Sequence, residues 1–239
     1  MKTFNYSTAL NALKLDKQPP RAVENLPMIP KQFVTKDFIE RFLPYVKILG
    51  DSREQDKWVE QYCNYYNINF EWCVKDEKKH TENLKEGDYT FKVIFGNKIY
   101  SYRNKVAYER KGSVSEFYNN CMKDRDRVKR EFERFNAKQY DKVVLMLEFG
   151  NRIDELINLE YGFYQKGENG KPVKKQFNVG NTIYSTIQSW KQPNGYAFEV
   201  IMNKNKTMLF WLVLQDMFYY FRNEIREECR KKGLIENEN

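Results

Sequence analysis

Histidine is almost absent from this chain of 239 residues, since the only one is His80. A Ser-His-Asp triad could be built only around that residue, and a metal site with several histidines cannot be built at all. The four cysteines are Cys63, Cys73, Cys121 and Cys229, and no two of them form a Cys-x-x-Cys pair. We therefore expect free thiols in a reducing compartment, with neither a zinc site nor a disulfide framework.

Long apolar runs are lacking as well. The most apolar segment covers residues 208–221, and Gln215 and Asp216 interrupt it, so it is too short to span a bilayer. The first residues contain no continuous apolar stretch of the kind found in secretory signals. We expect a soluble protein inside the cell, with no membrane partner.

Glycine and proline are scarce, with 11 and 7 residues, whereas phenylalanine and tyrosine each occur 17 times. This balance favours a packed core over a loop-rich or fibrous chain. The net charge of +8 is a mild bias toward an anionic partner. Charge alone does not identify that partner, because many basic domains bind nothing anionic.

Hydrophobic spacing predicts strands that alternate with helices along most of the chain. Strands are expected at 46–51, 69–74, 88–95, 98–103, 105–111, 141–149 and 196–202. Helices are expected at 36–46 (or a turn), 55–66, 114–122, 124–138, 183–190 and 206–230. Gly96-Asn97 is predicted to form a hairpin turn.

The remaining segments read as connections. The prolines of residues 1–35 argue for an irregular leader, and 150–180 reads as a short helix followed by a polar excursion. We expect an α/β fold with a mixed β-sheet flanked by helices in a single domain. The predicted boundaries give an N-terminal extension over 1–45, the domain over 46–230 and a polar tail over 231–239.

Three residues in the middle of the chain carry the predicted chemistry. Glu109 and Lys111 are two residues apart in an expected strand, so both project from the same face. Asp88 begins an earlier strand and can lie beside Glu109 in a folded sheet. Two carboxylates at one point suit a hard ion such as Mg²⁺, and an adjacent lysine can orient a water or stabilise charge on a phosphate. The pattern indicates metal-assisted phosphodiester hydrolysis, although chance produces it in many charged proteins.

The full set of motifs forms an ordered series. In chain order they are Asp51-Ser52-Arg53-Glu54, Gly87-Asp88-Tyr89, Glu109-Arg110-Lys111, Arg127 with Glu131, and the segment LMLEFG at 145–150. This series resembles the XPF-type nuclease domain (the excision-repair cross-complementation group four domain), a branch of the restriction-endonuclease-like PD-(D/E)XK superfamily. The resemblance covers roughly residues 46–225 and implies a restriction-endonuclease-like fold.

The resemblance implies a role for each of these residues. The metal ligands would be Asp51, Asp88 and Glu109, with Mg²⁺ as the ion and Mn²⁺ as a substitute, and Lys111 would be the catalytic lysine. The DNA-binding residues would be Arg53, Arg110 and Arg127, and the supporting acids would be Glu54, Glu116 and Glu131. Many members have an acid where this chain has Ser115, so either Glu116 substitutes for it or that role is lost.

The implied activity is a structure-specific endonuclease acting on branched, flapped or junction-containing DNA in recombination, repair or replication. No tandem helix-hairpin-helix module follows the domain, which favours the compact phage and bacterial versions and hence the cytoplasm of a bacterium or infected host cell. XPF-type domains often pair, so a homodimer is one option. Two alternatives stay open, namely a catalytically weak relative that binds branched nucleic acid and an unrelated α/β protein with chance surface acids.

Three further features have two interpretations each. Lys166, Lys171, Lys174 and Lys175 are either DNA contacts or ordinary residues of a polar loop. The aromatic run within 210–221 is either a stacking surface for bases or, as its apolar surroundings favour, a core or dimer interface. Glu148 either supports the catalytic residues or ends its strand as a structural cap.

Overall fold

The structure is a computed structural model that describes residues 4–15, 23–24, 28–75, 82–95, 98–166, 169, 171–191 and 196–234. The chain has a mixed α/β fold, as predicted. It divides into two compact units, with residues 1–103 and 210–239 in unit 1 and residues 104–209 in unit 2. The surface position expected for His80 and the turn expected at Gly96-Asn97 lie outside the described residues. None of the helices within the described ranges has the length and apolar character that crossing a membrane requires.

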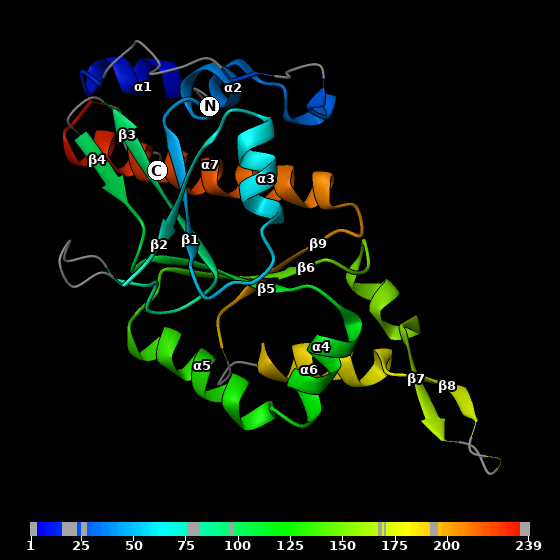
Figure 1. The fold of residues 1–239 in the computed structure, drawn as a ribbon. Helices are drawn as coiled ribbons and strands as arrows, with labels where there is room; N and C mark the ends of the chain where they lie inside the picture. Colours follow the sequence, from blue (N-terminus) through cyan, green and yellow to red (C-terminus); the bar gives the residue numbers. More distant parts are fainter. Residues whose placement is uncertain are drawn as a thin grey trace. The chain divides into compact units, whose positions relative to one another are not determined.

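Unit 1 is built on strands β2, β1 and β3, which lie side by side in this order, with β4 beside β3 (Figure 1). Their bounds are β1 Val46–Asp51, β2 Asn69–Cys73, β3 Tyr89–Phe95 and β4 Lys98–Ser101. β1 is parallel to β2 and antiparallel to β3, which in turn is antiparallel to β4. Parallel neighbours need a crossover connection, and α3 (Trp58–Tyr65) supplies it between β1 and β2.

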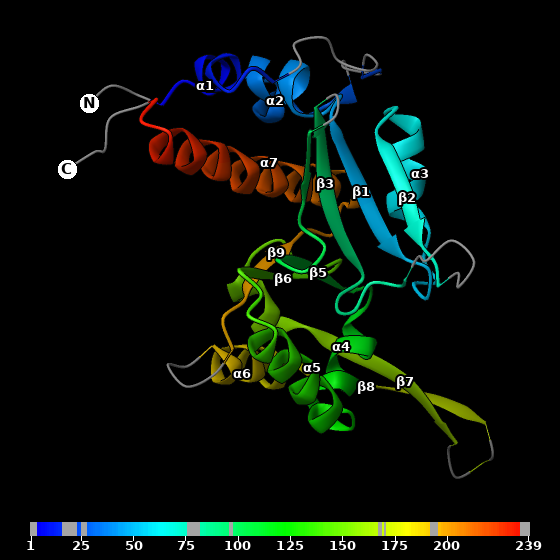
Figure 2. The same ribbon diagram turned by 90° about the vertical axis from the view of Figure 1, so that its left-hand side faces the viewer.

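The long helix α7 (Lys206–Lys231) begins in unit 2 and supplies much of the core of unit 1. Its aromatic residues Phe210, Trp211, Phe218 and Phe221 are buried. Phe221 stacks on Phe95 of β3 at 5.9 Å between ring centroids, and Figure 2 shows α7 alongside β3. The aromatic run is therefore core, as the apolar pattern favoured.

The prediction of an irregular leader over residues 1–35 is wrong at its start. Residues Tyr6–Ala12 form helix α1, because the side chain of Asn5 accepts a hydrogen bond from the backbone N–H of Thr8 at 2.9 Å and caps the first turn. All of the prolines follow this helix in the sequence and so do not interrupt it. Tyr6 is fully buried and its ring lies 5.4 Å from that of Phe218.

The rest of the N-terminal extension also packs into unit 1. A single 3-10 turn, η2 (Lys31–Phe33), precedes α2 (Lys36–Arg41). Phe38 and Phe42 contact Phe218 of α7, with centroid distances of 5.5 and 5.4 Å. The predicted boundary at 45/46 thus falls inside unit 1 and does not separate two compact units.

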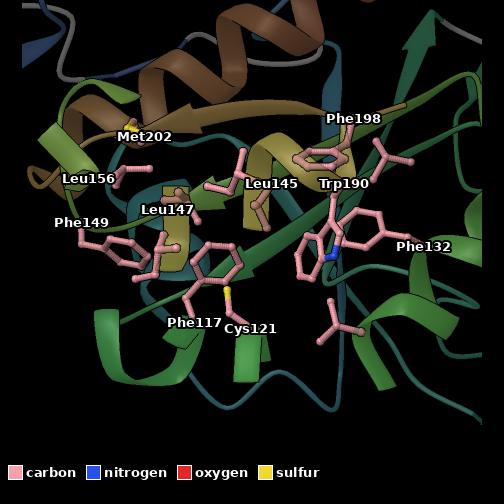
Figure 3. Close-up of a cluster of buried hydrophobic side chains, with 14 of the residues drawn as sticks. Phe117, Cys121, Phe132, Leu145, Leu147, Phe149, Leu156, Trp190, Phe198 and Met202 are labelled. Atoms are coloured by element: carbon pink, nitrogen blue, oxygen red, sulfur yellow. The ribbon is translucent and has the colours of Figure 1, made fainter. Parts of the chain in front are cut away.

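Unit 2 places strands β5, β6 and β9 against three helices. The bounds are β5 Val106–Lys111, α4 Val114–Met122, α5 Arg125–Ala137, β6 Lys142–Leu147, η3 Ile153–Asn158, α6 Gly180–Trp190 and β9 Glu199–Met202. β6 pairs in parallel with β5 and with β9, which explains why its sequence is a continuous apolar run. The helices bury Phe117, Phe132 and Trp190 against Leu145 and Leu147 of β6 (Figure 3).

Two elements of unit 2 differ from the prediction. β9 begins at Glu199 and not at residue 196, because the backbone N–H of Tyr196 donates to the carbonyl of Trp190 at the end of α6. The polar excursion contains an antiparallel two-stranded ribbon, formed by β7 (Glu160–Lys166) and β8 (Pro172–Asn178). In both ribbon views the far end of this pair extends away from α4 and α6 (Figures 1 and 2).

Candidate active site

The strand β5 brings Glu109 and Lys111 together in unit 2. Residues Ala107, Glu109 and Lys111 alternate onto one face of the strand, and Ala107 belongs to the core that the helices cover. The Nζ of Lys111 donates to Oε1 of Glu109 at 2.6 Å, with only 7% and 9% of the two side chains exposed. The shared face is what the two-residue spacing predicts. A buried carboxylate-ammonium pair results, and both groups are costly to desolvate.

Glu131 of α5 adds a second carboxylate to this group. Its side chain is 15% exposed. Burial raises its pKa to about 7, and the negative charge of Glu109 adds to the rise, whereas Lys111, Arg127 and Arg134 lower the pKa. Nη1 of Arg127 lies 3.8 Å from Glu131 and that side chain is 55% exposed. We call Glu109, Lys111 and Glu131 the Glu-Lys cluster.

Arg110 lies on the opposite face of β5 from the Glu-Lys cluster, and its guanidinium pairs with a buried acid. Nε of Arg110 donates to Oε1 of Glu148, whose side chain is 3% exposed. Oε2 of Glu148 lies 3.1 Å from Nζ of Lys206. Glu148 therefore bridges two cations, a role the sequence left open, and the ion pair occupies the guanidinium that was predicted to contact DNA. That DNA contact stays a prediction.

Asp51 of unit 1 ends strand β1 and is closed off by Arg53. Nε of Arg53 donates to Oδ1 at 2.9 Å, Nη2 donates to Oδ2 at 2.6 Å, and the backbone N–H of Arg53 donates to Oδ1 at 2.8 Å. The Asp51 side chain is 3% exposed, whereas that of Arg53 is 66% exposed. The hydrogen bond to Asp51 raises the pKa of Arg53, so the guanidinium is fully charged and holds both carboxylate oxygens.

Asp88 lies beside Asp51 in unit 1. The backbone N–H of Asp51 donates to the carbonyl of Asp88 at 2.8 Å. Gly87 before it has a φ of +76°, a left-handed conformation that glycine adopts readily. The charges of Asp88 and Glu86 both raise the pKa of Arg53, so three acids surround one guanidinium.

Sequence reasoning missed Glu86, which is only 7% exposed. The signal was an acid directly before Gly87-Asp88, but its burial depends on the turn at Gly87. We call Asp51, Glu86 and Asp88, with Arg53, the Asp-Arg cluster.

The two remaining supporting acids hold backbone. Oε1 of Glu54 accepts from the N–H of Asp56 at 2.8 Å. Oε2 of Glu116 accepts from the N–H of Gly112 at 2.9 Å, and Oγ of Ser113 accepts from the N–H of Glu116 at 3.1 Å. This is a capping arrangement at the start of α4. Glu116 thus stabilises a helix end next to Lys111, whatever else it does.

Every side chain that could hold a cation here donates through oxygen, which suits a hard divalent ion such as Mg²⁺. Within the described ranges there is no group of three or more His, Cys, Asp or Glu arranged to hold a metal ion. Asp51 has both oxygens on Arg53, so it would bind a metal only after that guanidinium moved away. The donor chemistry fits the ion, and the arrangement of Arg53 opposes its binding.

The sequence was also compared with known proteins. No protein-family model matches the chain, and a search of curated proteins gives no significant match.

Proposed function

We propose that this chain is a metal-dependent DNA endonuclease that hydrolyses phosphodiester bonds. The buried pair of Glu109 and Lys111 carries the proposal, because it puts a carboxylate and an ammonium 2.6 Å apart on one strand face. Burying two opposite charges is a costly way to gain stability, and buried ionisable pairs with perturbed neighbours are concentrated at functional sites. Glu131, with its pKa raised to about 7, is such a neighbour.

The proposed roles follow the resemblance to XPF-type nucleases. Asp51, Asp88 and Glu109 would bind Mg²⁺, or Mn²⁺ in its place. The ion would polarise the phosphate and supply a nucleophilic water near neutral pH. Lys111 would donate to that water or to the phosphate, and its contact with Glu109 fixes the position of its ammonium. Arg53 and Arg127, both more than half exposed, are the arginines best placed to contact DNA phosphates.

The proposed substrate is branched, flapped or junction-containing DNA in phage or bacterial recombination, repair or replication, again by resemblance. The first experiment incubates the protein with flap, fork, single-stranded and duplex DNA, with and without Mg²⁺ or Mn²⁺. Glu109→Gln should lose cleavage at least 100-fold, because one donated carboxylate is removed. Glu40→Gln, an exposed glutamate of α2, is the matched control and should cut as wild type does.

The assignment of three carboxylates to one ion has its own test. Calorimetric titration with Mn²⁺ should detect a site that both Asp88→Asn and Glu109→Gln abolish. A protein that leaves every DNA intact in either metal, or a Glu109→Gln variant that cuts normally, would disprove the proposal.

A second candidate function is binding of branched nucleic acid without cleavage. The observation that favours it is the bidentate contact of Arg53 with Asp51, which occupies both oxygens of one proposed metal ligand. Salt-sensitive DNA binding without any metal-dependent cleavage would support this candidate. Arg53→Ala separates the two further, because releasing Asp51 should strengthen Mn²⁺ binding if Asp51 is a ligand.

A further inference from the structure

The β7–β8 ribbon ends in a concentration of positive charge. Lys166 closes β7, Lys171 precedes β8, and Lys174 and Lys175 lie within β8, all of them exposed. The strand β8 contains no acidic residue, and the described acid of β7 is Glu160 at its first position. Glu160 and Lys166 are six residues apart, roughly 20 Å along a strand. We call these four lysines the lysine arm.

The base of the ribbon is fixed to the core of unit 2. The carbonyl of Leu159 accepts from the N–H groups of Val179 and Gly180, at 3.0 and 3.1 Å. The ring of Tyr161 lies 6.2 Å from that of Tyr118 on α4. The far end therefore extends from an anchored support (Figures 1 and 2).

The register distributes charge over both faces of the ribbon. Lys166 pairs with Pro172, and Lys174 is two positions further along β8, so Lys166 and Lys174 share a face. Lys175 projects from the other face. Residues 171–176 are exposed on both faces, and 49% of Val173 is exposed. A two-stranded ribbon exposed in this way is only marginally stable in water, which favours a bound partner.

The chemistry of the lysines indicates what that partner is. Elsewhere lysines share acids: Lys47 and Lys92 both contact Glu71, and Lys98 and Lys232 both contact Glu228. The lysine arm makes no ion pair with any residue in the described ranges. Lysines also protect strand edges from aggregation, but edge protection does not require the exclusion of acids from the whole of β8. Unpaired, like-charged side chains on an anchored ribbon suit a polyanion.

We propose that the lysine arm binds the phosphate backbone of duplex DNA flanking the cleavage point. A two-stranded ribbon is narrow enough to enter the major groove, which is about 12 Å wide. Lysines on both faces then reach the phosphates on either side of the groove. The inference rests on the proposed function for the identity of the polyanion, and it extends that function by assigning the residues that hold the substrate.

The test measures binding of a labelled DNA duplex by fluorescence anisotropy in EDTA, so that cleavage plays no part. The arm variant carries Lys→Gln at positions 166, 171, 174 and 175. The matched control carries Lys→Gln at 14, 31, 36 and 231, four exposed lysines of unit 1, and changes the net charge equally. The arm variant should bind at least tenfold more weakly, and its salt dependence should fall by roughly 0.9 per lost phosphate contact.

Each outcome decides the inference. A selective loss of binding in the arm variant, with unchanged thermal unfolding, supports it even if no DNA is ever cut, in which case only the nuclease proposal fails. Equal binding by arm and control variants overturns it even if wild type cleaves DNA. A wild type that binds no duplex, or an arm variant whose main effect in sedimentation is loss of a dimer, also overturns it.

Discussion

At the scale of single residues, the pair of Glu109 and Lys111 is the most consequential contact, because neither group has bulk water around it. We expect Glu109→Gln to lower the free energy of unfolding by about 3 kcal/mol, since the Lys111 ammonium would then face an uncharged amide. The double variant Glu109→Gln with Lys111→Met should recover part of that loss. Urea unfolding measures both variants. A double variant less stable than Glu109→Gln alone would contradict this expectation.

Glu131 gives a pH dependence of known sign. Its pKa is raised from 4.5 to about 7 in the folded protein, so between these values the folded state keeps a proton that the unfolded chain has released. Stability therefore decreases as the pH rises through this interval. Glu131→Gln should flatten that decrease, whereas Glu133→Gln, exposed on the same helix, should not. Urea unfolding at pH 5 and pH 8 compares the two, and equal slopes would refute the assignment.

At the scale of secondary-structure elements, the start of α4 separates capping from catalysis at Glu116. Glu116→Ala removes the acceptor for the N–H of Gly112 and should cost about 1 kcal/mol. Glu116→Gln keeps an acceptor oxygen, so it should retain stability. If capping is the whole role of Glu116, the Gln variant also keeps cleavage. A Gln variant that is stable but inactive would show that Glu116 replaces the acid missing at Ser115.

Gly180 fixes the junction between η3 and α6. A Cβ at this position would lie 2.0 Å from the carbonyl oxygen of Leu156 and 2.3 Å from that of Ile157. Backbone atoms cannot move aside as a flexible side chain can, so Gly180→Ala should destabilise by about 3 kcal/mol or more. Gly50→Ala meets only the rings of Phe70 and Trp72 and should cost less. Thermal unfolding of the two variants ranks them, and the reverse order would contradict the packing described.

Local spacing explains how much of the elements and site could be predicted. Alternation with a period of two was enough to put Glu109 and Lys111 on one face, and apolar runs located most strands and helices. The contact of Glu148 with Lys206 joins residues far apart in the sequence, so no local pattern contains it. The closure of Asp51 by Arg53 depends on one side-chain rotamer. The helix α1 was missed because nearby prolines outweighed the cap at Asn5.

At the scale of the whole molecule, unit 1 is assembled from both ends of the chain. A fragment of residues 1–103 lacks Trp211, Phe218 and Phe221, which are buried against its strands and helices. We expect this fragment alone to be unfolded by near-ultraviolet circular dichroism, and a peptide of residues 206–234 to restore its structure. A fragment that folds cooperatively without the peptide would show that α7 is dispensable.

The discontinuity of unit 1 has a consequence for synthesis on the ribosome. Residues 104–239 must still be translated after the first part of unit 1 is complete, which takes roughly ten seconds at ~5–20 residues per second. During that time the strand that carries Phe91, Val93 and Phe95, all buried in the finished protein, has no α7 to cover it. The nascent chain therefore presents an apolar sheet surface to chaperones until its last helix emerges from the exit tunnel.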